Sequence, residues 1–79
     1  MNGMTVLEEN IRCWTVRAIP AHVGSGEAVI RCRDNRTGQV TRPAYLYKVP
    51  SGWRGQQIDR LPVPDYVKAA GRRLMRKLP

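Results

Sequence analysis

Hydrophobic positions along this chain first alternate with polar ones and later, near the C-terminal end, recur every three or four residues. Segment 11–19 (IRCWTVRAI) is rich in β-branched and aromatic residues and ends at Pro20, which is typical of a strand. Segment 27–34 alternates regularly and predicts a second, half-buried strand. Its expected inward set is Ala28, Ile30 and Cys32, and its outward set is Val29, Arg31 and Arg33.

The sequence DNRTG at 34–38 is the strongest local signal, with Asp and Asn at the start of a turn and Gly at its end. It predicts a hairpin whose second strand covers 39–49. Pro43 cannot donate a ladder hydrogen bond, so this strand is either an edge strand or interrupted there. Tyr45 and Tyr47 are expected on one face of it, and Ala44 and Leu46 on the other.

The C-terminal segment has a helical period. Residues 50–62 contain two Gly and two Pro without periodicity, so we expect a connecting loop that Trp53 attaches to the core. Pro64 and Asp65 suit the first turn of a helix that extends to about Leu78. Its apolar stripe is Val63, Val67, Ala70, Leu74 and Leu78. Gly71 weakens such a helix by about 1 kcal/mol relative to Ala unless close packing requires it.

These elements together predict one small α+β domain. A three-stranded antiparallel sheet would be followed by an amphipathic, basic C-terminal helix packed on one of its faces. Residues 1–10 are polar and would form an N-terminal arm, and residues 11–79 the domain itself. A chain of 79 residues buries only about 60% of its unfolded surface, so its stability is expected to be modest.

Charge is the most informative feature of the composition. Fourteen Lys and Arg residues oppose six Asp and Glu residues, a net charge of +8, and eleven of the fourteen are Arg. Guanidinium groups suit phosphates and carboxylates and stack on bases, so nucleic acid or an acidic protein surface is the expected partner. A solvated surface, or a genome rich in G and C, would also explain this composition.

Catalytic and metal-binding patterns are weak. His22 is a lone histidine, no Ser or Cys has an evident base, and the acidic residues are scattered, so we expect neither an enzyme nor a bound cofactor. Cys13 and Cys32 would form a bridge, or a metal site with His22, only if they lay opposite each other. We expect two free, apolar thiols instead.

The opening MNGMTVLEEN shows no secretory signal and no segment is apolar enough to cross a bilayer. These features predict a cytoplasmic location, reduced thiols and no membrane partner.

Two candidate binding surfaces follow from the distribution of cations. One is the helix, where residues 60–79 carry six basic and one acidic side chain. Its candidate contacts are Lys68, Arg72, Arg73, Arg76 and Lys77. The other is the outer face of the sheet with its flanking turns, and its candidates are Arg31, Arg33, Arg36 and Arg42, beside Arg12, Arg17 and Trp14. Sheets with basic and aromatic outer faces are known to bind nucleic acid.

The leading hypothesis is therefore a nucleic-acid-binding module, with DNA favoured over RNA. The alternative is a small regulator or inhibitor, of the kind carried by phages and plasmids, that binds an acidic surface of a host protein or complex.

Overall fold

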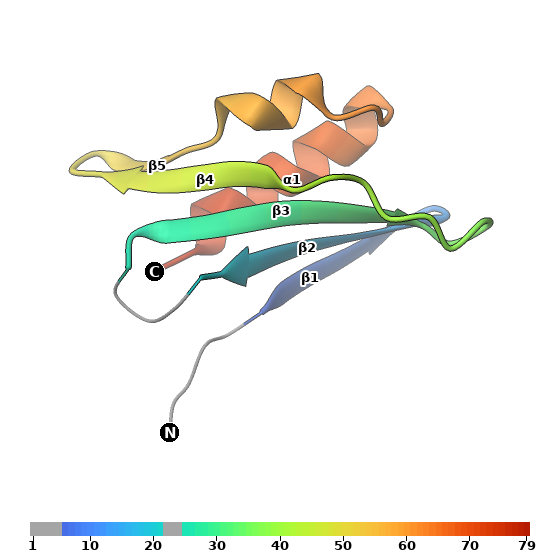
Figure 1. The fold of residues 1–79 in the computed structure, drawn as a ribbon, viewed down its shortest axis with the longest axis horizontal. Helices are drawn as coiled ribbons and strands as arrows, with labels where there is room; N and C mark the ends of the chain where they lie inside the picture. The colour runs from blue at the N-terminus through green and yellow to red at the C-terminus, as the bar shows by residue number, and fades with distance from the viewer. Residues whose placement is uncertain (1–5, 22–24) are drawn as a thin grey trace.

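The computed structural model describes residues 6–21 and 25–79 of the chain. Five strands form one antiparallel sheet in the order β1-β2-β3-β4-β5, and the sheet curls into a half-barrel. Helix α1 (Asp65–Lys77) crosses one side of it, behind the strands in Figure 1. The strands are β1 (Leu7–Ile11), β2 (Trp14–Pro20), β3 (Glu27–Asp34), β4 (Ala44–Val49) and β5 (Gly52–Arg54). The expected α+β class and C-terminal helix are confirmed, but the expected number of three strands is wrong.

The first additional strand comes from the N-terminal segment. Residues 7–10, which we expected in a polar arm, belong to β1, and this strand pairs with β2 from Leu7↔Ala18 to Ile11↔Trp14. A two-residue turn at Arg12 and Cys13 separates these strands, so the expected strand 11–19 is divided there. Arg12 adopts a φ of +53°, a conformation more usual for Gly, Asn or Asp. The residue types at positions 12 and 13 therefore do not predict this turn.

The second additional strand lies in the expected loop 50–62. Strand β5 pairs with the end of β4, from Tyr47↔Arg54 to Val49↔Gly52, and the 3₁₀ helix η1 (Gln56–Arg60) follows it. The side chain of Trp53 packs against the core, as expected. Its indole Nε1 also donates a hydrogen bond of 3.2 Å to the carbonyl oxygen of Pro79. Three residues between Gly- and Pro-rich neighbours give too short a pattern to predict a strand.

The hairpin at 34–38 is confirmed. The Gly38 amide donates a hydrogen bond of 2.7 Å to the Asp34 carbonyl, and Gly38 has a φ of +79°. The chain then returns along β3 through an isolated bridge, Arg33↔Val40, before β4 begins at Ala44. The second strand of the hairpin is thus interrupted around Pro43, one of the two arrangements that the sequence predicted.

The core lies between the inner face of the sheet and α1. The alternation in β3 is confirmed, because Ala28, Ile30 and Cys32 are buried beneath the helix, and Ala44 and Leu46 continue that face in β4. The helix contributes most of the expected stripe: Val67, Ala70, Leu74 and Leu78 are buried, and Val63 is half-buried. Ile58 of η1 is fully buried and fills the space between the sheet and α1.

Trp14 corrects one expectation about the sheet. The sequence placed it with the arginines of the outer face, whereas it is only 8% exposed and lies on the inner face with Val16 and Ala18. The reason is the turn at Arg12 and Cys13, which sets the phase of β2. The outer face is thus left with Arg17 as its basic residue in β2.

Candidate functional site

Three of the five basic residues on α1 are engaged within the molecule. Lys68 Nζ donates a hydrogen bond of 3.0 Å to the carbonyl oxygen of Asp59 and lies 3.9 Å from a carboxylate oxygen of Asp65. Arg72 forms an ion pair with the carboxylate of Asp59 in η1. These contacts fasten the helix to η1 and neutralise part of the expected basic row.

Arg73 makes the third contact, to the edge of the sheet. Glu9 faces the helix side of β1, and the Arg73 guanidinium donates hydrogen bonds to its carboxylate, one of them 3.2 Å long. This hydrogen bond lowers the pKa of Glu9 and raises that of Arg73. Among the described residues, only Arg76 and Lys77 of the helix candidates have no ion pair, and both are exposed at its C-terminal end. Cations there complement the helix dipole.

On the opposite side of the sheet, two arginines lie directly across from each other. Arg17 of β2 pairs in register with Arg31 of β3. Cross-strand Cβ atoms are about 4.5–5.5 Å apart, and like charges in such a pair destabilise the sheet. Glu8 compensates Arg17, whose Nε donates a 2.7 Å hydrogen bond to its carboxylate. Arg31 has neither an ion pair nor a side-chain hydrogen bond within residues 6–21 and 25–79.

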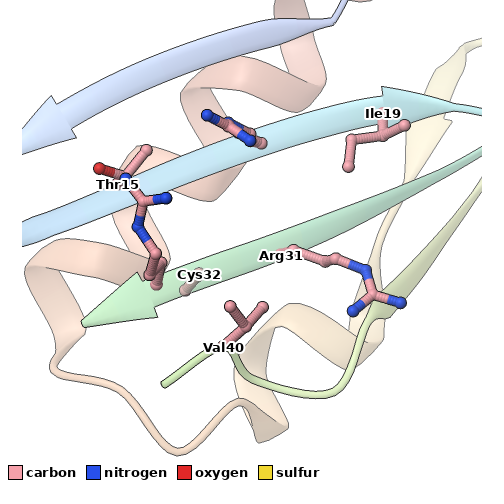
Figure 2. A pocket seen from close by; sticks show the side chains of 7 residues that line it. Thr15, Ile19, Arg31, Cys32 and Val40 are labelled. Carbon is pink, nitrogen blue, oxygen red and sulfur yellow. The ribbon is translucent and has the colours of Figure 1, made fainter. Parts of the chain in front are cut away.

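These arginines surround a hollow of about 220 Å³ on the outer face, which we name the arginine hollow. Figure 2 shows Thr15 and Ile19 of β2, Arg31 of β3 and Val40 around it, with the helix behind the strands. Arg17 of β2 and Arg33 of β3 complete its basic lining, and Cys32 of β3 also borders it. Arg33 Nε donates a 2.8 Å hydrogen bond to the side-chain oxygen of Asn35, which holds the guanidinium near the rim.

A second hollow, of about 410 Å³, lies where β4 meets η1, and we name it the tyrosine hollow. It is lined by Arg42, Pro43, Tyr45, Gln57, Arg60 and Leu61. Tyr45 is 59% exposed on the outer face of β4. Gln57 accepts a 3.0 Å hydrogen bond from the Tyr45 amide, so η1 covers the part of β4 that β5 does not reach.

The structure therefore divides the predicted site residues among separate places. Arg31 and Arg33 come together in the arginine hollow and Arg42 lies in the tyrosine hollow, whereas Lys68, Arg72, Arg73, Arg76 and Lys77 lie on the helix. Arg36 is in the hairpin turn, where its hydrogen bonds to the Asp34 carboxylate lower the pKa of Asp34. Arg12 lies over the ring of Tyr66, 4.6 Å from its centre.

Sequence reasoning missed Arg60 and Gln57 as site residues. They lie in a segment interpreted as a loop, and only the position of η1 beside β4 brings them to Tyr45.

The two cysteines are not opposite each other. In register, Val16 lies across from Cys32, while Cys13 lies in the turn between β1 and β2. Burial raises the pKa of the Cys32 thiol to about 11, so it stays neutral at physiological pH. Within the described ranges, no group of three His, Cys, Asp or Glu side chains is arranged to hold a metal ion. His22, the third ligand considered, lies outside the described residues.

Known proteins supply no analogy for this surface. No family model, no curated protein and no solved structure matches the chain. Of the helices in the described part, none is both long and apolar enough to cross a membrane.

Proposed function

We propose that this chain is a nucleic-acid-binding module whose contact surface is the outer face of its sheet. The observation that carries this proposal is the cross-strand pair Arg17↔Arg31 at the rim of the arginine hollow. Glu8 neutralises Arg17, but Arg31 has no acidic partner in the described chain, so the repulsion between the two guanidinium groups is only partly offset in the free protein. A phosphate bound at Arg31 would offset the remaining repulsion, because a guanidinium group donates several hydrogen bonds to phosphate oxygens.

The ion pairs of the helix favour the sheet over the helix as this surface. Lys68, Arg72 and Arg73 would have to leave acidic partners before binding phosphates. Arg31 has no acidic partner in the described chain, and Arg42 and Arg60 extend the cationic surface across β4 to η1. Lys68, Arg72 and Arg73 then serve mainly to hold α1 on the sheet and η1.

Two double variants with equal charge test this proposal. Replacing Arg31 and Arg33 by Gln removes two charges from the sheet, and replacing Arg76 and Lys77 by Gln removes two from the helix. Binding of fluorescent single-stranded DNA, single-stranded RNA and duplex DNA is measured by anisotropy at several salt concentrations. Each phosphate contact contributes about −0.7 to −0.9 to the slope of log K against log salt. The sheet variant should therefore lose about 1.4–1.8 of the slope, while the helix variant should lose little.

A larger loss in the helix variant would assign the phosphates to α1 and overturn the proposal. If the unsubstituted protein binds none of the probes at low salt, nucleic-acid binding itself is refuted. Binding to an acidic surface of another protein would then become the leading hypothesis, because that interaction would use the same cations and requires no affinity for nucleic acid.

A further inference from the structure

We infer that the outer face of the sheet binds single-stranded nucleic acid, with a base stacked on Tyr45 and the neighbouring phosphates held by the arginines of the two hollows. This inference rests on the proposed function and specifies its ligand. Its basis is the arrangement of the side chains on the outer face of β2, β3 and β4.

Two adjacent rows of side chains lie on the outer face, one across β2 and β3 and the other from β2 to β4. The first is cationic, with Arg17 opposite Arg31. The second is apolar and aromatic, with Ile19 opposite Val29 and Val29 opposite Tyr45. Successive residues on one face of a strand are about 6.6 Å apart, so charges and apolar groups lie side by side along this surface.

The second row joins the two hollows. Ile19 lines the arginine hollow at one end of the row and Tyr45 lines the tyrosine hollow at the other. Ala44 pairs with Ile30. Their neighbours, Pro43 of the tyrosine hollow and Arg31 of the arginine hollow, therefore lie on adjacent parts of the chain. A chain lying across this surface would thus contact Arg17 and Arg31 at the arginine hollow, and Tyr45, Arg42 and Arg60 at the tyrosine hollow.

The exposed ring of Tyr45 favours a single strand over a duplex. A tyrosine ring stacks on the face of a base, and that face is free in a single strand but covered by neighbouring bases in a duplex. Reading a duplex groove also requires an element that protrudes into it. Here the ring lies in a hollow beside Pro43 and Leu61, a place that an unstacked base can occupy.

Tyr47 provides a matched control on the same strand. It is 48% exposed and shares the outer face with Tyr45, but it lines neither hollow. Its cross-strand neighbour on β3 is Glu27, whose carboxylate would repel a phosphate. Replacing either tyrosine by Thr introduces a β-branched residue that is also favoured in strands, and Tyr45→Phe retains the ring without the hydroxyl.

The experiment measures binding of a thymidine oligonucleotide of about twelve nucleotides, the same backbone with abasic residues, a uridine oligonucleotide and a duplex. We expect the single strands to bind more tightly than the duplex. Tyr45→Thr should weaken binding of the base-bearing strands about 5- to 150-fold, from the usual contribution of one stacked base. Tyr47→Thr and Tyr45→Phe should have small effects. The abasic strand should bind weakly and should not distinguish Tyr45→Thr from the unsubstituted protein.

The outcomes separate this inference from the proposed function. Equal effects of Tyr45→Thr on the base-bearing and abasic strands, or tighter binding of the duplex, would overturn stacking on Tyr45. In either case, a smaller slope of log K against log salt for the Arg31 and Arg33 double variant would still support the proposed function, without stacking on Tyr45. Circular dichroism and melting of each variant verify that the fold is retained, which is expected because Tyr45 lies on the solvent side of β4.

Discussion

Two glycines packed against the same core residue, Ile58, are expected to respond to Ala substitution in opposite directions. Gly71 lies in the middle of α1 and is buried. A Cβ atom there would lie 3.4 Å from Ile30 Cγ2 and 3.7 Å from Ile58 Cγ2, which are ordinary contacts. Since Ala is favoured over Gly by about 0.8–1 kcal/mol in a helix interior, Gly71→Ala should stabilise the domain by about 0.5–1 kcal/mol.

Gly55, between β5 and η1, has no such space. A Cβ atom there would lie 2.5 Å from Leu46 Cδ2, 2.9 Å from Met75 Sδ and 3.1 Å from Ile58 Cδ1. Its φ of −149° is negative, so the conflict is one of packing rather than of backbone conformation. Overpacking of this kind costs about 1–3 kcal/mol, and Gly55→Ala should be destabilising by that amount.

Thermal unfolding followed by circular dichroism measures both effects. For a domain of this size, 1 kcal/mol corresponds to about 4–8 °C in Tm. Gly71→Ala should raise Tm by about 2–8 °C, and Gly55→Ala should lower it by at least about 4 °C. A fall in Tm for Gly71→Ala would show that α1 lies closer to β3 than the structure places it, and would contradict the packing argument.

Two further predictions concern the helix and its contacts. Leu74→Ala should reduce the free energy of unfolding by about 2–5 kcal/mol, because Leu74 is 2% exposed in the core; an unchanged urea midpoint would contradict its burial. Glu9→Gln should reduce Tm near neutral pH, because the Arg73 hydrogen bond lowers the pKa of Glu9 below its ordinary value of 4.5 and so makes its ionised form stabilising. That contribution is lost as the pH falls below 4.5 and through the lowered pKa, so the difference in Tm between the two proteins should shrink as the pH falls below 4.5, and a difference that stays constant on acidification would contradict this assignment.

The sequence predicted those elements whose signals are local. The DNRTG turn needs only its own residues, because the Asp34 carbonyl accepts the hydrogen bonds that close it and Gly38 takes the positive φ. Strand β3 alternates over its whole length, and the stripe of α1 recurs with the helical period, so both could be assigned with the correct faces.

The missed elements depend on contacts distant in sequence. The turn between β1 and β2 uses Arg12, whose positive φ is retained while its guanidinium stacks over Tyr66 of the helix. Strand β5 is three residues long and exists only as a partner for the end of β4. The tyrosine hollow likewise requires η1 to lie beside β4, which no local pattern indicates.

The outer face of the sheet replaces the helix as the main candidate surface because most of the helix cations form ion pairs within the molecule. The sequence showed a helix with only positive charge from Lys68 onward, but its partners, Glu9 and Asp59, lie in other elements. Five of the six acidic residues form ion pairs, with Arg17, Arg36, Lys68, Arg72 and Arg73.

Nine of the fourteen basic residues therefore carry no ion pair, and all nine lie in the described ranges. Arg12 and Lys48 lie over aromatic rings, and Arg76 and Lys77 complete the end of the helix. Four of the remaining five are Arg31, Arg33, Arg42 and Arg60, and each of these lines one of the two hollows. The cations that the fold leaves with neither an acidic nor an aromatic partner thus lie mainly around the two hollows, where Arg42 and Arg60 line the same hollow as Tyr45.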